Sequence, residues 1–529
     1  MRDFQLPGRS PAVASHGMAA TSHPLATLTA LDVLRDGGNA IDAAIAACAA
    51  QCVIEPHNTT IGGDCFVLYA PGGGDEVIVL NGSGRAPAAA EPAWFAEAGI
   101  TEIGVSSPHS VTIPGAVDAW ERLAADHGRK DLGELLKPAI EFAESGVPVP
   151  ARTAADWAAE SDLLREDADA ARILLPGGRA PAPGEIHRQP ELADTLRTIA
   201  EQGRAGFYEG PVAEDMVERL RSLGGLHTLD DFAAHGAVYV QPIETSYRGY
   251  DVFECPPNGQ GIIALIMLNI LSGYELGDLD PLGAERLHLE IEAGRLAFRD
   301  RNAFVADPEL AEVPVERLLD PDYAAELRGH IDPGRAMAAL PPSSIPRHAD
   351  TVYLTVVDRD RNAVSFINSI FHSFGSGIMA PMSGVLLQNR GYGFRVDPAH
   401  PNCIGPRKRP LHTIIPGMAC KDGRAVLPFG VMGGHYQPFG HVHLLTNLID
   451  FGMDAQEGLD CPRVFHDEGR LVVERGVGAE ARRGLAEMGH EVVEAGSPLG
   501  GGQAIRIDHE RGVLVGGSDP RKDGCALGY

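Results

Sequence analysis

A threonine stands at position 351, where a polar linker meets a strand-like run of the sequence. Residues 333–350, PGRAMAALPPSSIPRHAD, are rich in proline, serine and alanine and lack a sustained hydrophobic period. This composition predicts an exposed, poorly structured linker that is accessible to cleavage. Residues 351–358, TVYLTVVD, alternate in character and are rich in β-branched side chains, which predicts a strand that enters a sheet.

A hydroxyl group at such a junction can become a nucleophile. A threonine hydroxyl is weak unless a base takes its proton, and a free α-amine on the same residue can be that base. Cleavage of the Asp350–Thr351 bond would create this amine, whose ordinary pKa of about 7.7–8.0 leaves a usable neutral fraction at physiological pH. Spacing alone favours the simpler interpretation that Thr351 is the first residue of an intact strand.

The elements that must position Thr351 are indicated by periodicity and by turn residues. Residues 24–52 predict two closely packed helices, separated at Gly37-Gly38-Asn39, with Asn39 as the cap of the second helix. Residues 351–369 predict a hairpin with its turn at Arg359-Asp360-Arg361. Strands are predicted at 65–70, 76–84, 250–257, 351–358, 362–369, 383–389, 425–434, 470–476 and 512–520, and helices within 115–235 and at 262–271, 437–451 and 479–488.

Composition excludes some classes of protein. The net charge of −28 argues against a nucleic-acid surface, and the run Arg407-Lys408-Arg409 is too short to change this. That run is either a solvated loop or a contact for a substrate carboxylate. The N-terminal residues carry no apolar stretch of signal-peptide length, so we expect a cytoplasmic protein with no membrane partner. The length of 529 residues suggests two or three domains, although one core built from two intertwined halves also reaches this size.

Two other classes of function compete with the nucleophile hypothesis. A metal-dependent hydrolase is one, because several histidines and an aspartate lie close in sequence near the C-terminus: His435, His441, His443, His466 and Asp467. The H-x-H spacing on a helix would send two imidazoles to different faces, and the eight cysteines contain no C-x-x-C pair. We therefore expect neither a metal nor another cofactor. The second competitor is a binding protein that kept the fold and stays unprocessed.

Several stretches in combination resemble the γ-glutamyltransferase family across nearly the whole chain. Members of this family cleave themselves before a threonine. The stretches that carry the resemblance are SHPLATLTALDVLRDGGNAIDAAIAA, EPHNTTIGGDCF, CPPNGQG, DTVYLTVVDRDRNAVSFINSIFHSFGSGI, SGVLLQN, RKRPLHTIIPGM, GVMGG and SDPRKDGCALGY.

The resemblance implies a fold, a mechanism and catalytic residues. The fold would be α+β, the αββα sandwich of N-terminal-nucleophile hydrolases, with fragments 1–350 and 351–529 forming a heterodimer as one intertwined unit, with a dimer of such pairs as a further option. Thr351 would be the nucleophile and Ser369 a hydroxyl that hydrogen-bonds it. Gly433 and Gly434 would bind the oxyanion through their backbone N–H groups, because glycine lets the backbone approach the substrate closely.

The positions that would bind a glutamyl group depart from the family pattern. Arg85 is displaced by two residues from the usual position of the carboxylate-binding arginine, and His412-Thr413 replaces a serine pair. Phe371 replaces an asparagine, and Gly393 replaces the acidic residue that holds the α-ammonium group.

Arg390 also stands in place of a neutral amide, next to these departures. Arg85, Arg390, His412, Thr413 and Phe371 are thus the candidate substrate-binding residues. We expect an amidohydrolase or acyltransferase that acts on a small acidic acyl donor of the γ-glutamyl amide or glutathione type. The alternative is an oxamate-type or short acyl amide hydrolase without α-amine recognition.

Overall fold

Two seven-stranded antiparallel sheets lie at the centre of the computed structural model, which describes residues 8–338 and 351–529. In spatial order, the first sheet contains β1 (Ala12–Ala14), β18 (Val513–Ser518), β17 (Gly501–Asp508), β13 (Arg424–Met432), β12 (Gly417–Lys421), β9 (Tyr250–Glu254) and β8 (Ile243–Tyr247). The second sheet contains β19 (Cys525–Gly528), β2 (Met18–Thr21), β10 (Val352–Val357), β11 (Ala363–Ser369), β3 (Asp64–Ala70), β4 (Ile78–Gly82) and β7 (Val238–Val240).

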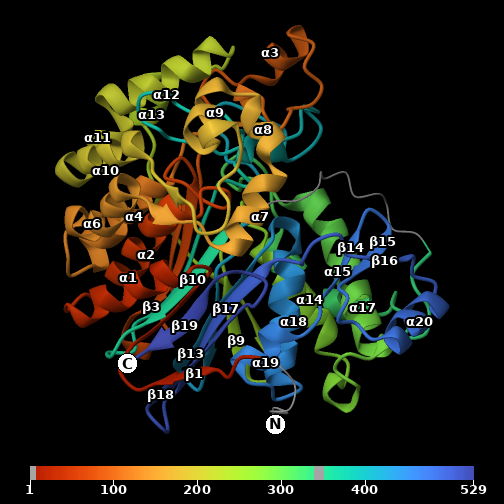
Figure 1. The fold of residues 1–529 in the computed structure, drawn as a ribbon. Coiled ribbons are helices and arrows are strands. Elements are labelled where there is room, and N and C mark those ends of the chain that lie inside the picture. The colour runs from red at the N-terminus through yellow and green to blue at the C-terminus, as the bar shows by residue number, and fades with distance from the viewer. Residues whose placement is uncertain (1–7, 339–350) are drawn as a thin grey trace.

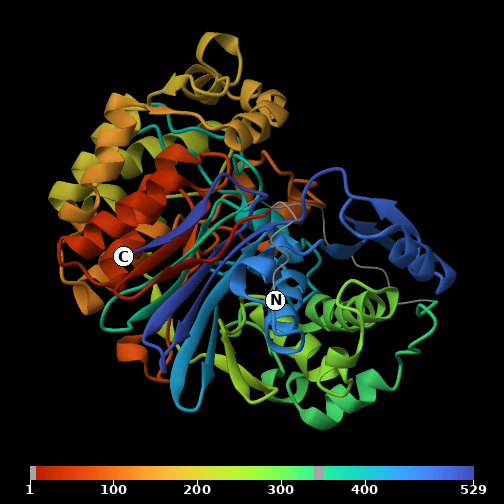
Figure 2. The same cartoon turned by 60° about the horizontal axis from the view of Figure 1, so that its bottom comes forward.

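Helices cover the outer face of each sheet, as the two views of the ribbon show (Figures 1 and 2). Against the second sheet pack α1 (Pro24–Arg35), α2 (Ala40–Ile54) and α4 (Ala116–His127), with α6 (Lys137–Ser145) and α10 (Pro190–Gln202) outside them. Against the first sheet pack α14 (Gly261–Leu271), α18 (Gln437–Ile449) and α19 (Ala455–Asp460), with α15 (Ala284–Phe304) outside them.

The remaining elements are added around the four layers, which are the two sheets and the helices on their outer faces. The other α-helices are α3 (Pro92–Glu97), α5 (Leu132–Leu135), α7 (Ala151–Ala159), α8 (Ser161–Arg165), α9 (Ala168–Leu174), α11 (Ala205–Tyr208), α12 (Gly210–Ser222), α13 (Leu229–Ala233), α16 (Val315–Leu318), α17 (Pro321–Arg328) and α20 (Ala479–Glu487). Two small sheets are formed by β5 (Val147–Pro148) with β6 (Ile186–His187), and by β14 (Val464–Asp467), β15 (Arg470–Val473) and β16 (Val492–Glu494).

The space between the two large sheets is an apolar core. Phe66, Tyr353 and Ile367 from the second sheet meet Met418 and Met432 from the first, and all five are fully buried. Because both faces of β10 and β11 are covered, all residues of both strands are buried. Burial of this apolar surface is the main force that holds the sheets together.

The helix pair α1 and α2 forms from the predicted local signals. Asn39 caps α2 in a capping box, in which its side chain accepts from the backbone N–H of Asp42 and the Asp42 side chain accepts from the N–H of Asn39. All fifteen residues of α2 are buried, and its many alanines allow the helix to pack closely against its neighbours. The predicted break and cap are confirmed.

The hairpin of β10 and β11 places the junction residue. Its register pairs Val352 with Asn368, so that Thr351 lies opposite Ser369. The turn is tied down by Asp358, whose carboxylate accepts from the backbone N–H groups of Asp360, Asn362 and Ala40. The predicted hairpin is confirmed.

The predicted α+β sandwich is also confirmed, with differences in detail. Residues 383–389 form no named strand but only isolated bridges, such as Gly62 with Leu387, so the predicted strand there is wrong. The linker prediction falls largely on residues 339–350, which lie outside the described residues. Strands from both sides of position 350 alternate within each sheet: β10 and β11 lie between β2 and β3. None of the helices in the described part of the chain is long and apolar enough to cross a membrane.

Candidate active site

The Thr351 hydroxyl lies inside the protein at the entrance to β10. Thr351 is fully buried, and its Oγ1 lies 3.0 Å from the Oγ of Ser369 at the end of β11. The Ser369 oxygen also accepts hydrogen bonds from the backbone N–H of Phe371, at 2.9 Å, and from Nη2 of Arg390, at 3.0 Å. Two donors therefore hold the hydroxyl that contacts the predicted nucleophile.

The backbone at Phe371 explains how its N–H reaches Ser369. Phe371 has a φ of 79°, which is rare for a bulky residue. The ring packs under the Arg390 guanidinium, whose carbon lies 4.2 Å from the ring centroid. This geometry favours a cation–π contact, so the aromatic side chain compensates part of the cost of burying the charge.

Arg390 is the cation next to the nucleophile. Its side chain is fully buried in the turn Arg390–Gly393, where Nη1 donates to the Thr413 Oγ1 at 2.6 Å. Its buried Nε has no hydrogen-bond partner among the described residues. Burial lowers the pKa of Arg390 to about 9, and the Asp64 carboxylate opposes this shift. The guanidinium thus remains charged at neutral pH and lacks a direct carboxylate partner within the described part of the chain.

His412 is bonded to Asp64 rather than to a hydroxyl of the site. Its Nε2 lies 2.9 Å from the Asp64 Oδ2, and its Nδ1 accepts weakly from the backbone N–H of Ile414 at 3.4 Å. Burial lowers the pKa of His412 to about 4, helped by the nearby Arg390 charge. A neutral ring whose two nitrogens both have hydrogen-bond partners is typical of a histidine that serves the protein core. Substrate binding by His412 stays a prediction.

Asp64, which the sequence analysis did not single out, organises this side of the site. The carboxylate is fully buried and its Oδ1 accepts from the N–H groups of Gly84 and Gly115 and from the side chain of Gln388. Together with His412, four donors fill it. The sequence places Asp64 at the start of a strand, within the EPHNTTIGGDCF stretch, and this was the only hint of its role. No rule of residue spacing distinguishes it from other aspartates.

Gly433 and Gly434 follow β13, just before α18. Their φ values are 121° and 55°, and a Cβ on Gly433 would lie 2.9 Å from the Cα of Gly500. Only glycine adopts such a backbone without strain, and a turn of this kind exposes successive N–H groups. Oxyanion binding by the N–H groups of Gly433 and Gly434 stays a prediction.

Two sets of hydrogen bonds meet at Thr413, one at its hydroxyl and one at its carbonyl, and connect this glycine turn to the nucleophile. The first set runs from Thr351 through Ser369 and Arg390 to Thr413. The carbonyls of Thr413 and Gly434 both accept from the side chain of Gln260, at 2.8 Å each. The structure therefore brings together residues from five separate stretches of the sequence, and Gln260 in the CPPNGQG motif was not among the predicted site residues.

Arg85 lies at a different place in the hydrogen-bond network. Its guanidinium makes two bonds to the Glu309 carboxylate, at 2.8 and 2.9 Å, and one to the carbonyl of Arg407. Arg409 joins the same carboxylate at 2.9 Å. Since Glu309 already occupies Arg85, a substrate carboxylate would have to displace it, and binding by Arg85 stays a prediction.

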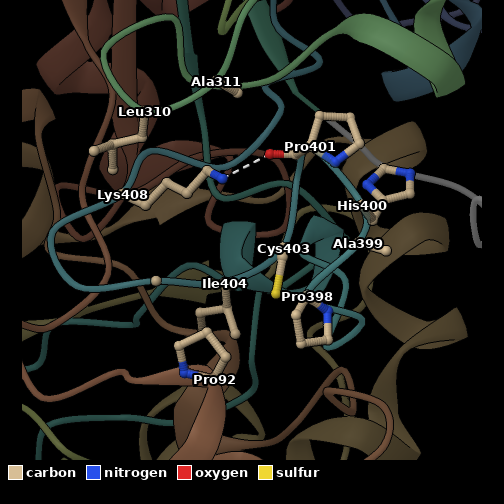
Figure 3. A pocket seen from close by; sticks show the side chains of 11 residues that line it. Pro92, Leu310, Ala311, Pro398, Ala399, His400, Pro401, Cys403, Ile404 and Lys408 are labelled. Atoms are coloured by element: carbon tan, nitrogen blue, oxygen red, sulfur yellow. Dashed lines mark hydrogen bonds between the residues drawn. The ribbon is translucent and has the colours of Figure 1, made fainter.

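A surface pocket of about 430 Å³ lies near this arginine cluster and away from the predicted catalytic residues, none of which lines it. Figure 3 shows Lys408 and Cys403 on its wall, with Nζ of Lys408 donating to the carbonyl of Pro401 at 2.6 Å. Burial lowers the pKa of Lys408, which remains a poor candidate for catalysis because its ammonium group is already bonded.

The C-terminal histidines have protein partners. His441 contacts Glu254 at 2.6 Å and His443 contacts Glu290 at 3.3 Å, on different sides of α18 as the spacing predicts.

A different group, His288, Glu292 and His490, has ligand atoms within 4.8 Å of one another and could hold a metal. However, Arg295 already pairs with Glu292 at 2.6 Å, and the two histidines bond each other at 2.8 Å. The expectation of a metal-free protein stays a prediction.

Comparison with known proteins identifies the family of the chain. A family model described as gamma-glutamyltranspeptidase matches residues 26–529. The chain is 39% identical to the "Glutathione hydrolase-like YwrD proenzyme" of Bacillus subtilis, over 97% of this chain and 98% of that one. It is 37% identical to the "Oxamate amidohydrolase proenzyme" of Klebsiella pneumoniae, over 98% and 99%.

A solved structure extends the likeness to three dimensions. The cephalosporin acylase from Bacillus halodurans superimposes with a TM-score of 0.94 at 40% identity, covering 100% of this chain and 99% of that chain. The match covers nearly the full length of the chain, in sequence and in fold. The chain therefore belongs to the γ-glutamyltranspeptidase family and is a self-processing hydrolase of C–N bonds with an N-terminal-nucleophile fold.

Proposed function

We propose that the enzyme cuts its own chain between Asp350 and Thr351 and then cleaves the amide bond of a small acyl donor that carries a carboxylate. The fragments are 1–350 and 351–529. The observation that carries this proposal is the buried Arg390 guanidinium, which lies one hydroxyl group away from Thr351.

Each step of the reaction has a group to perform it. The new α-amine of Thr351 takes the proton from its own Oγ1, and Oγ1 attacks the carbonyl carbon of the donor. The tetrahedral oxyanion accepts hydrogen bonds from the N–H groups of Gly433 and Gly434. The protonated amine then gives its proton to the leaving group, which departs and leaves an ester on Thr351. Water, or an acceptor amine, releases the acyl group.

Arg390 supports an anionic donor for an energetic reason. A fully buried cation without a direct carboxylate partner is costly, and the cost falls when a ligand supplies the counter-charge. The Nε–H group of Arg390 still has a donor to offer, and guanidinium groups match carboxylates in geometry. The acidic end of the donor is therefore expected beside Arg390.

We expect the site to bind an α-ammonium group on the donor poorly. Gly393 carries no carboxylate at the position where the family holds this group, and the Asp64 carboxylate is filled by four N–H donors. A γ-glutamyl donor would place its ammonium group near Arg390 without a free counter-charge. We expect γ-glutamyl amides to be accepted less well than otherwise identical amides without the amine.

A matched pair of substrates tests this. Glutaryl anilide and γ-glutamyl anilide differ only in the α-amino group, and oxamate tests a shorter acyl chain. We expect kcat/KM for the glutaryl compound to be at least about tenfold higher, a difference of about 1.4 kcal/mol. A preference for the γ-glutamyl compound would show that the enzyme recognises the amine after all.

The scission point has its own test. Thr351→Ala should give one intact polypeptide without amidase activity, because alanine has no hydroxyl group to attack either the preceding peptide bond or the donor. Thr355→Ala, on β10, is the control and should still be cleaved, since its hydroxyl donates to the Val364 carbonyl rather than to a group at the junction. Mass analysis reads both, and two fragments from the Thr351 variant would refute the position of the cut.

A further inference from the structure

The side chain of Gln260 connects the oxyanion turn to the Arg390 side of the site. Gln260 is fully buried at the start of α14. Its Nε2 donates to the carbonyl of Thr413 and to the carbonyl of Gly434, both at 2.8 Å. Its own backbone N–H donates to the carbonyl of His412 at 2.9 Å. One residue thus holds the two segments on which the site is built.

The orientation of the Gln260 amide is fixed by Arg301. Nη1 of Arg301, on α15, donates to the Gln260 Oε1 at 2.8 Å and lies 2.9 Å from Nδ1 of His435. A guanidinium group has only donors, so it must face the oxygen of the amide, and the NH₂ group must face the two carbonyls. Arg301 is itself held in place, since it is buried and lies 4.0 Å over the Phe298 ring.

We propose that Gln260 is a positioning residue for the oxyanion site: its amide, oriented by Arg301, sets the peptide plane that follows Gly434 at a fixed place relative to Thr413 and Arg390. This rests on the proposed role of Gly433 and Gly434. Gln260 itself touches no reacting atom. It holds the turn whose N–H groups face the developing charge, and Thr413 holds the cation that binds the donor.

The expected effect follows from the sensitivity of such sites to placement. A displacement of about 1 Å can lower a rate by about 10²-fold, and loss of one oxyanion donor lowers it by about 10²–10³-fold. Because the oxyanion forms only in the transition state, a misplaced turn lowers kcat more than it changes KM. A purely structural role would instead lower the melting temperature and leave the turnover of the folded fraction unchanged.

Gln260→Glu is the decisive substitution. The carboxylate has nearly the same shape and keeps the contact with Arg301, but it cannot donate to the two carbonyls. We expect kcat to fall by about 10- to 100-fold with KM changed less than about threefold. Gln456→Glu is the matched control, because the side-chain amide of buried Gln456 also donates to two acceptors, the Ser518 carbonyl and the Asp460 carboxylate, away from the nucleophile. Its kcat should equal that of the wild type.

A second variant covers the case in which Gln260→Glu does not fold. Arg301→Met leaves Gln260 intact but removes the donor to its Oε1, so the amide is free to rotate and kcat should fall at least about threefold at unchanged KM. A folded variant of either kind with wild-type kcat overturns the proposal.

Gly434→Ala separates this inference from the proposed function. If Gly434→Ala is impaired and Gln260→Glu is not, the positioning role is wrong while the oxyanion site stands. If Gly434→Ala retains full kcat, the oxyanion role itself is wrong, and the role of Gln260 falls with it. If both variants lose kcat and the Gln456→Glu control does not, the positioning role is supported.

Discussion

At the scale of single residues, the hydroxyl of Ser369 is the direct partner of the Thr351 hydroxyl. Ser369→Ala deletes the bond to Thr351 Oγ1 and leaves the Arg390 Nη2 without its acceptor. A hydrogen bond that involves a charged group contributes about 1.5–3 kcal/mol, so we expect kcat to fall by about 10- to 100-fold.

Steady-state kinetics on the processed enzyme measures this effect. Ser365→Ala is the control on the same strand, because Ser365 bonds Tyr353 and the Phe429 carbonyl rather than the nucleophile. It should lose stability without losing kcat. Equal kcat values for the two variants would mean that Ser369 contributes only to packing.

At the scale of elements, the close approach of Gly63 to β11 controls where Ser369 lies. A Cβ on Gly63 would be 2.4 Å from the carbonyl oxygen of Ser369, a distance that side chains essentially never adopt. Gly63→Ala must therefore push the end of β11, with its serine, away from β3. We expect at least about a tenfold loss of activity and slower self-cleavage, because a shift of about 1 Å suffices for such losses.

The matched control for this prediction is Gly74→Ala. At Gly74 a Cβ would meet only the Pro71 carbonyl, at 3.6 Å, which is an ordinary contact. Activity assays and the extent of cleavage on gels read both variants. Full activity in Gly63→Ala would show that the strand end tolerates displacement and that the placement of Ser369 is not critical.

How far the sequence predicts these elements depends on whether their signal is local. The cap at Asn39 and the turn near Asp358 are local, and the structure confirms both. Residues 383–389 carry a strand-like apolar pattern because they are buried, yet they make only isolated bridges. β17 begins with two glycines and lacks β-branched residues at its start, so it has no counterpart among the predicted strands.

The same distinction applies to the site. The places of Thr351 and Ser369 follow from one hairpin, and the structure brings their hydroxyls together. The bond between His412 and Asp64 joins residues 348 positions apart, and the bonds from Gln260 to the carbonyls of Thr413 and Gly434 span 153 and 174 positions. No periodicity or spacing within one segment encodes such pairs, so only the folded structure identifies them.

At the scale of the whole molecule, the sheets link the two parts of the chain on either side of position 350. β10 pairs with β2, β11 pairs with β3, β12 pairs with β9 and β18 pairs with β1. Each pairing joins a strand before position 350 to one after it. Cleavage at the junction would therefore leave the fragments held by both sheets, and separating them would require opening the core.

The stability of this core should depend on pH through its histidines. Burial lowers their pKa values to about 4, or to about 3 for the last of them: His23, His187, His227, His235, His412, His466 and His490. Burial also raises the pKa values of Glu55, Glu254 and Asp358, which works in the opposite direction because the folded state then binds their protons more readily.

The sign of the pH effect follows from which state binds protons. In the unfolded chain a histidine has a pKa of about 6.5, so between pH 6.5 and 4 the unfolded state takes up protons that the folded state refuses, and stability falls as the pH falls. Each such histidine contributes a slope of at most about 1.4 kcal/mol per pH unit.

Because the histidines outnumber the opposing carboxyl groups, we expect the melting temperature of the processed protein to drop steadily from pH 7 to pH 5. His227→Gln, which can still donate to the Val111 carbonyl, removes one of these titrating groups. The slope of stability against pH should then become smaller by at most about 1.4 kcal/mol per pH unit. A melting temperature that stays constant or rises over this range would show that these rings accept protons without cost to the fold.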